Sequence, residues 1–296
     1  MVYNILVKIF NVILNNYVRK DDRKMDKISL AGDLGSGKST VANILLDAIG
    51  AEYYSTGGMV RAIAERMNMT IGELNVYMET HPEIDKEIDD GLVALGDDPR
   101  SMIFDSRLAW HFTSGTFKVY LSTDIEVAAT RIMSAKRSVE KSSTLEEAIL
   151  CTKQRRASEK KRYSEKYGVD ITDLSNYSLV VDTTYATPDE VAGVILSCFE
   201  AWKRDKTAKF CYLSPERLNY IDDEHDADKL SEYSAALESC EDIPHVTVYE
   251  QDGEFYIEGG IESALAYAFN LYTFVPVTLV CGSSDGKQYV KMKNSL

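Results

Sequence analysis

Residues 32 to 39 read Gly-Asp-Leu-Gly-Ser-Gly-Lys-Ser, a complete G-x-x-x-x-G-K-[ST] phosphate-binding loop. An apolar run at 27–31 precedes this phosphate loop, and a helical pattern at 38–49 follows it. Glycines let successive backbone N–H groups point at phosphate oxygens, while Lys38 supplies a cation and Ser39 a hydroxyl for Mg²⁺. The stretch therefore predicts a strand, a loop and a helix that bind ATP. The residues predicted to bind ATP are Gly32, Gly35, Ser36, Gly37, Lys38, Ser39 and Thr40.

Composition limits the classes of partner. The chain has 296 residues, enough for two domains, and a net charge of -14. That charge would repel nucleic-acid phosphate and anionic lipid, so we expect a small phosphorylated substrate, held by a local cluster of basic side chains, and no nucleic acid. The five cysteines are far apart and form no C-x-x-C pair, which predicts neither disulfides nor a zinc site, and favours the cytoplasm.

Residues 1–24 form an apolar but interrupted segment before Met25. A membrane anchor is one interpretation. Polar residues such as Lys8 and Asn11 interrupt the run well short of the ~20 apolar residues that a spanning helix needs. We therefore favour an N-terminal extension that results from an over-extended start.

Short apolar strands alternate with helical patterns through the first two thirds of the chain, which is typical of βαβ organisation. Strands are predicted at 27–31, 52–55, 101–105, 117–122 and 177–182, and helices at 38–49, 58–67, 82–95 and 188–202. A highly charged helical region at 144–167 has little apolar surface, so we do not expect it in the core. These elements predict one domain at 25–203.

After a polar linker at 203–209 the pattern changes to that of a small α+β unit, called the tail (209–296) below. Its predicted strands are 210–213, 245–249, 254–258, 274–281 and 287–291, and its predicted helices are 228–239 and 261–271. The last two strands are expected to pair across Asp285-Gly286. We predict a separately folded accessory domain that catalysis does not need, with a protein partner possible.

Arginines gather after the predicted strands of this acidic chain. They are Arg61, Arg107, Arg131, Arg155, Arg156 and Arg162. A guanidinium binds phosphate oxygens bidentately and neutralises the charge of a phosphoryl group in transfer. As a set, these arginines predict a second phosphate site beside the first.

Several motifs resemble the archaeal-type cytidylate kinases, a family of nucleoside monophosphate kinases, over about 26–202. The resemblance rests on the phosphate loop and on Ser55-Thr56-Gly57 with Arg61, His81-Pro82-Glu83-Ile84-Asp85, Asp105-Ser106-Arg107, and Arg155 with Arg162-Tyr163, Tyr167-Gly168-Val169-Asp170 and Tyr177 through Thr183. It implies a phosphate-loop α/β fold, with a five-stranded parallel sheet, helices on both faces and a helical lid.

The resemblance also implies roles for individual residues. It assigns Ser55 and Arg61 to the acceptor monophosphate, and Asp105 and Arg107 to the acceptor substrate. It assigns catalytic roles beside Lys38 to three further arginines: Arg131 at the base of the lid, and Arg155 and Arg162 within it.

Two positions depart from the usual family pattern. The residue after Ser-x-Gly is Gly58 where the family often has an acid, and Ser106 replaces a glycine before Arg107. Both positions belong to the acceptor pocket, so they bear on the identity of the base.

The tail resembles ParB/sulfiredoxin-like domains, through Leu213-Ser214-Pro215 and the stretch from Val248 to Val277. That family usually has a phosphate-binding arginine after the glycine, and this chain has Gly259-Gly260-Ile261-Glu262 instead. Because a carboxylate repels phosphate, we expect a module without catalytic activity.

The expected function is transfer of the γ-phosphoryl group from ATP to a nucleoside monophosphate, with CMP or dCMP as the favoured acceptor and Mg²⁺ held through Ser39. Two alternatives stay open at this point. One is a kinase for another small acceptor, and the other is a regulatory protein in which bound ATP controls the tail.

Overall fold

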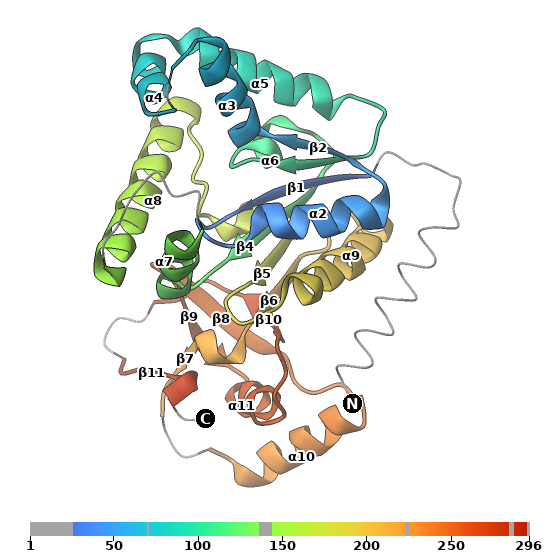
Figure 1. The fold of residues 1–296 in the computed structure, drawn as a ribbon. Coiled ribbons are helices and arrows are strands. Elements are labelled where there is room, and N and C mark those ends of the chain that lie inside the picture. Colours follow the sequence, from blue (N-terminus) through green and yellow to red (C-terminus); the bar gives the residue numbers. More distant parts are fainter. Residues whose placement is uncertain (1–25, 70, 136–143, 223–224, 284–286, 295–296) are drawn as a thin grey trace.

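The computed structural model describes residues 26–69, 71–135, 144–222, 225–283 and 287–294, and these form an α/β fold around one continuous sheet (Figure 1). The extension predicted at 1–24 lies outside the described residues. Among the described helices, none combines the length and the apolar character needed to cross a membrane.

The strands follow the order β11-β7-β9-β8-β10-β6-β5-β4-β1-β3-β2 across the sheet. Their bounds are β1 Lys27–Gly32, β2 Glu52–Ser55, β3 Met102–Asp105, β4 Phe117–Ser122, β5 Leu179–Asp182, β6 Phe210–Leu213, β7 Leu218–Tyr220, β8 Val246–Gln251, β9 Glu254–Gly259, β10 Val275–Leu279 and β11 Val290–Lys291. Strands β2, β3, β1, β4 and β5 pair in parallel, which confirms the predicted parallel α/β fold.

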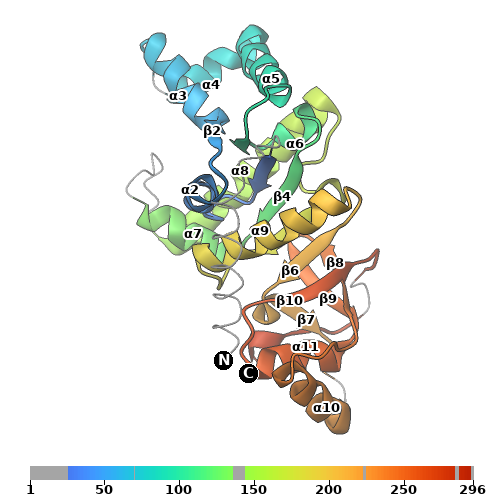
Figure 2. The same cartoon turned by 90° about the vertical axis from the view of Figure 1, so that its right-hand side faces the viewer.

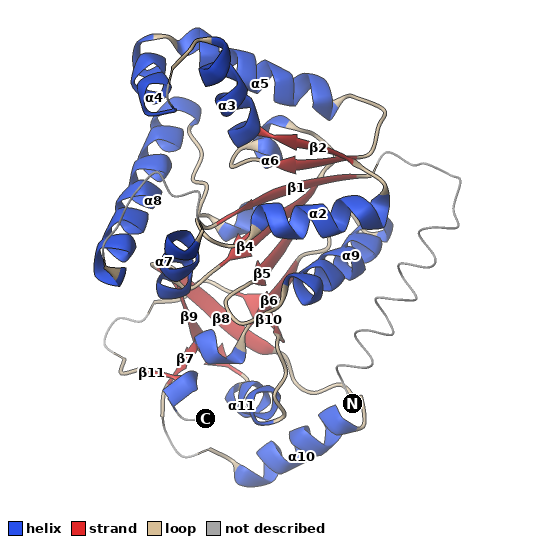
Figure 3. Cartoon of the chain, viewed as in Figure 1, coloured by secondary structure: helices blue, strands red, loops and turns tan. Residues whose placement is uncertain are grey.

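Figure 3 shows the helices around this sheet. Their bounds are α2 Lys38–Ile49, α3 Thr56–Arg66, α4 Ile71–Thr80, α5 Pro82–Gly96, α6 Ala109–Phe112, α7 Ile125–Ser134, α8 Leu145–Tyr167, α9 Pro188–Arg204, α10 Ala227–Glu238 and α11 Ile261–Phe269, with short 3₁₀ turns at Leu174–Asn176, Pro215–Arg217 and Met292–Asn294. Helices α3, α4 and α5 form a helical arm at one end of the molecule, and the tail lies at the other (Figures 1 and 2).

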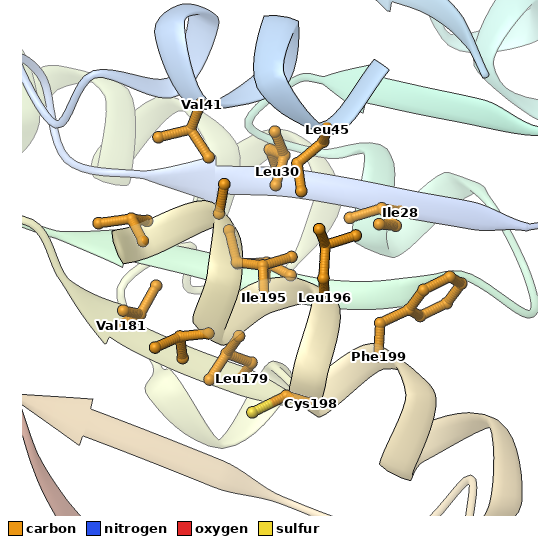
Figure 4. Close-up of a cluster of buried hydrophobic side chains, with 14 of the residues drawn as sticks. Ile28, Leu30, Val41, Leu45, Leu179, Val181, Ile195, Leu196, Cys198 and Phe199 are labelled. Carbon is orange, nitrogen blue, oxygen red and sulfur yellow. The ribbon is translucent and has the colours of Figure 1, made fainter. Parts of the chain in front are cut away.

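The main core lies between the parallel strands and the helices α2 and α9 (Figure 4). In β5, Leu179 and Val181 face this core, whereas Val180 belongs to a second core with Trp110 of α6. This alternation follows from the two-residue period of a strand, and it explains why the buried strands read as continuous apolar runs. The sheet is therefore covered on both faces.

The sheet does not end at β5, so the predicted strand count was too low. Strand β6 pairs in parallel with β5, with Val180 opposite Cys211, and β10 then pairs antiparallel with β6. The linker before β6 thus separates two units that share one sheet, and the separate folding of the tail stays a prediction.

The last strand pairs differently from the expectation. Strand β11 is antiparallel to β7, with Val290 opposite Tyr220, so the predicted pairing of 287–291 with 274–281 was wrong. Strand β7 itself was not predicted, because its three residues are too few to show a period.

Helix α8 is the charged segment predicted at 144–167, and it stands beside the sheet rather than on it (Figure 1). Its carboxyl end contacts α5 of the helical arm. Lys166 forms an ion pair with Asp85, and the Tyr167 hydroxyl donates to Asp89 at 2.8 Å. These contacts link α8 to the arm.

The burial of β1 in the main core predicts a loss of stability when one of its side chains is shortened. Leu30 is 0% exposed, so Leu30→Ala should lower the free energy of unfolding by about 2–5 kcal/mol, through lost apolar burial and the cavity left behind. Leu150→Ala is the matched control, because that side chain is 56% exposed and should cost no more than about 0.5 kcal/mol. Urea unfolding measures both, and equal losses would contradict this core.

Candidate functional site

The phosphate loop is held by close backbone packing. A Cβ at Gly32 would collide with the backbone of Leu121 in β4, and one at Gly35 with the backbone of Ala128 in α7. Gly35 and Gly37 have φ values of 73° and 79°, in the left-handed region that favours glycine. Gly37 faces open space and precedes α2, so the loop and the positive end of this helix both meet whatever occupies that space.

Lys38 folds back over this loop. Its Nζ donates to the carbonyl oxygens of Asp33 at 2.8 Å and Gly32 at 3.2 Å, and to Ser36 Oγ at 3.3 Å. Burial, and then the nearby positive charge of Arg107, lower the pKa of Lys38 to about 7. A bound anion would favour the charged ammonium and raise this pKa again.

Asp105 lies beside the serine of the loop. Ser39 Oγ donates to Asp105 Oδ2 at 3.1 Å, and the Tyr53 hydroxyl donates to the same oxygen at 2.7 Å. The contact joins a residue expected at the acceptor substrate to one expected at Mg²⁺. It forms because β3 is the parallel neighbour of β1, so both strands end at the same edge of the sheet.

The Ser39 hydroxyl and the Asp105 carboxylate suit Mg²⁺ better than a metal ion that takes all its ligands from the protein. A hydroxyl and a carboxylate are hard oxygen donors, and Mg²⁺ is usually held by one or two carboxylates together with water and phosphate oxygens. In the part of the chain that the structure describes, no three His, Cys, Asp or Glu side chains gather into a metal site.

Asp33 is a buried carboxylate within the loop that the sequence analysis did not single out. It accepts hydrogen bonds from the Tyr120 hydroxyl at 2.8 Å and the Thr123 backbone N–H at 3.0 Å. Arg156 of α8 also forms an ion pair with Asp33, at 3.1 Å. Asp33 therefore fixes the loop to β4 and to α8.

Glu159 is a second carboxylate that was missed. Its two oxygens bind Arg107 Nε at 2.9 Å and Arg155 Nε at 3.2 Å. Arg107 also donates to the Gly32 carbonyl. Burial alone would raise the pKa of Glu159, but the two guanidinium groups hold it below its usual value. The i,i+4 spacing of Arg155 and Glu159 is the sequence signal that could have revealed this partner.

Arg131 connects the loop to the end of β5. It donates to the carbonyl oxygens of Thr183 at 2.7 Å and Thr184 at 3.1 Å, and to that of Gly35 at 3.4 Å. The structure thus places Arg131 against the phosphate loop, while Arg162 of α8 lies over the ring of Tyr163.

Ser55 and Arg61 come together at the start of α3. Ser55 Oγ accepts a hydrogen bond from the Gly58 N–H, which caps this helix. The Arg61 guanidinium lies against Gly57 and Gly58, at ordinary van der Waals distance from where their Cβ atoms would be. The Arg61 guanidinium therefore lies beside the capped start of α3.

A shallow hollow, partly open to solvent, lies beside the phosphate loop. It is bounded by the loop, by Arg107, by α8 and by the segment 171–177. Its lining residues are Ala31, Gly32, Asp33, Leu34, Arg107, Tyr120, Arg156, Glu159, Ile171, Thr172 and Tyr177. Paired arginines and carboxylates beside aromatic rings suit a polar, anionic ligand with a planar group.

Comparisons with known proteins cover the same part of the chain. The model of the cytidylate kinase-like family matches residues 27–185. A cytidylate kinase of Thermoplasma volcanium is 37% identical over 60% of this chain and 93% of that protein, and one of Sulfolobus acidocaldarius is 38% identical over 57% and 92%. An S-adenosylmethionine-dependent nucleotide dehydratase of Lacinutrix mariniflava is 37% identical over 59% of this chain but only 36% of that protein. The family match ends before the tail.

The lowered pKa of Lys38 predicts proton uptake when polyphosphate binds. Near pH 8.5 a terminal phosphate is fully ionised, and Lys38 of the free protein is mostly neutral, so binding of ATP should take up close to one proton. Calorimetry in buffers of different ionisation enthalpy measures this number. Lys38→Met should abolish the uptake, and a buffer-independent enthalpy in the unmodified protein would contradict the prediction.

Proposed function

The chain belongs to the cytidylate kinase-like family, and from that membership we propose that it transfers the γ-phosphoryl group of ATP to CMP or dCMP. The observation that carries the proposal is that Lys38, with the Ser39 and Asp105 oxygen pair nearby, lies next to the arginine cluster around Glu159. A phosphoryl-transfer site needs this combination of a donor-phosphate cradle and mobile positive charge.

The positive charges of the site are neutralised by the protein itself in the absence of ligand. Arg107 and Arg155 share Glu159, and Arg156 pairs with Asp33. Phosphate oxygens offer the same bidentate geometry as a carboxylate, so Arg107 and Arg155 can exchange Glu159 for the phosphates. Lys38 would leave the carbonyl groups of the loop and reach the β and γ phosphates.

Mg²⁺ would be held by the Ser39 hydroxyl and the Asp105 carboxylate. When bound, it neutralises charge on the phosphate oxygens. The protein supplies no covalent intermediate, and its contribution is to position the two phosphates and stabilise the charge between them. Asp105 is thereby proposed as a metal-side residue, although the family resemblance placed it with the acceptor.

Ser55 and Arg61 are proposed to hold the acceptor monophosphate from the helical arm. Arg162, from the polar helix α8, is proposed to cover both phosphates and exclude water, which would otherwise hydrolyse ATP. The contacts of α8 with α5, through Lys166 and Tyr167, give a path by which the arm and α8 move together.

An assay of ADP release with CMP, dCMP, UMP, AMP and GMP tests the reaction. We expect ADP formation that depends on CMP or dCMP, and Lys38→Ala should lower kcat by about 10²-fold or more because it removes charge from the transition state. Lys229→Ala, which removes an exposed lysine of α10, is the matched control. Near-normal turnover by Lys38→Ala, or ATP binding without acceptor-dependent ADP, would refute the kinase assignment.

Two arginines of α3 test the acceptor side. Arg61→Ala should raise the KM for CMP by about tenfold or more while the KM for ATP changes less than about twofold, since one charged contact to the monophosphate is lost. Arg66→Ala should change neither KM, because Arg66 forms an exposed ion pair with Glu87. Steady-state kinetics distinguishes the two variants, and a rise in the ATP KM alone would reverse the assignment of the two sites.

A further inference from the structure

An arginine of the tail is buried at the end of the kinase-like sheet. Arg217, in the 3₁₀ turn before β7, is 3% exposed. Its Nη1 lies 3.2 Å from Oδ1 of Asp182, which is the last residue of β5 and is also buried. The pairing of β6 with β5 brings the tail to this point.

The same guanidinium group holds the second residue after β5. Arg217 Nη1 donates to Thr184 Oγ1 at 3.1 Å. That hydroxyl also accepts from the Asp124 N–H at 2.9 Å and donates to Asp182 Oδ1 at 2.6 Å. Asp124 caps α7, the helix that carries Arg131. Arg217 therefore fixes both the 183–184 segment and the start of α7.

Arg131 also holds the 183–184 segment. It donates to both carbonyl oxygens of that segment and also to Gly35 of the phosphate loop. The contacts thus run in one connected series from Arg217 through Thr184 and Arg131 to Gly35. Each step is a hydrogen bond between groups that are buried or partly buried, where such bonds restrict movement most.

A second series of contacts starts at the same guanidinium. Arg217 Nη2 donates at 2.8 Å to the carbonyl of Gly253, in the turn between β8 and β9. Arg156, which pairs with Asp33 of the loop, lies against this turn. Burial disfavours its charge, but Asp33, Tyr120 and then Glu250 of β8 hold the pKa of Arg156 above its usual value. The tail therefore reaches the phosphate loop along two routes.

A contribution to folding stability does not by itself explain why a charged side chain is buried at position 217. A buried ion pair is often no more stabilising than apolar residues of the same volume, because both charges lose their hydration. Moreover, Arg217 Nε is buried and has no hydrogen-bond partner among the described residues, which adds a cost. The forked geometry that reaches Asp182, Thr184 and Gly253 together is what only arginine supplies.

We propose that Arg217 is a positioning residue of the nucleotide site, through which the tail fixes Arg131 and the phosphate loop in the geometry that ATP requires. The inference rests on the proposed kinase function. It assigns the tail a part in catalysis, where the sequence alone predicts an accessory domain that catalysis does not need.

The test compares Arg217→Lys with Arg204→Lys in the full chain. Lysine keeps the charge beside Asp182 but cannot also reach Thr184 and Gly253, so we expect the KM for ATP to rise about tenfold and kcat to fall about tenfold, while the KM for CMP changes less than about twofold. Arg204 is an exposed residue of α9, and Arg204→Lys should change none of these values. If both KM values of Arg217→Lys stay unchanged and its lost rate matches its loss of folded protein, the residue is only structural and the proposal is overturned.

A double-mutant cycle tests the route through Arg131. Because one of the two routes runs through Arg131, Arg217→Lys should lower the rate less in the Arg131→Ala background than in the unmodified chain. Additive losses would overturn the proposal. Should Arg217→Lys fail to fold, Arg217→Met/Asp182→Asn removes both charges of the pair. Its rate is then compared with and without Arg131→Ala in the same way.

Direct ATP binding separates this inference from the kinase assignment. Displacement of a fluorescent ATP analogue, without any acceptor, should show about tenfold weaker ATP binding by Arg217→Lys than by the unmodified chain. If the unmodified chain binds ATP but phosphorylates no monophosphate, the proposed function fails, and this affinity ratio still decides the role of Arg217. Equal affinities would overturn that role.

Discussion

Close contact between glycines and neighbouring backbone determines where everything else in the site can lie. Gly32 touches β4 and Gly35 touches α7 at distances that leave no room for a side chain. The loop is therefore held against two elements that lie about 90 residues further along the chain. Once it is fixed there, Gly37 before α2 faces open space, Lys38 folds back onto the carbonyl groups of the loop, and Ser39 reaches Asp105.

The positively charged side chains of this site are paired with carboxylates of the protein itself. The chain carries a net charge of -14, yet the arginines around the phosphate loop are balanced locally by Glu159 and Asp33. Lys38 differs from these arginines. Burial among carbonyl groups and the positive charge of Arg107 lower the pKa of Lys38. On the proposed function, an anionic ligand would meet arginines that carboxylates already position and a lysine whose pKa the ligand would raise.

Much of the kinase-like fold could be predicted because its signals are local. The glycine spacing of the phosphate loop and the apolar runs of β1, β4 and β5 are patterns of consecutive residues. The elements predicted from them have bounds close to the observed ones. The contacts of Asp105 with Ser39 and of Glu159 with Arg107 could not be predicted, because they join residues 66 and 52 positions apart through strand order and helix placement. The same reason applies to β6, whose four residues look alike whether they begin a new sheet or extend an old one. The contact of Arg217 with Asp182 could not be predicted either, since it depends on the pairing of β6 with β5.

The pairing of Asp182 with Arg217 has a consequence for synthesis of the chain. The amino-terminal part leaves the ribosome first and can begin to fold before the rest is made. Strand β5 would then pair with β4 while Asp182, which already accepts a hydrogen bond from the Thr184 hydroxyl, still lacks its cation. Full burial of that charge without the cation is unfavourable. The cation of this pair emerges only with the turn that follows β6, so the 183–184 segment gains its contact with Arg217 later than β5 itself is made.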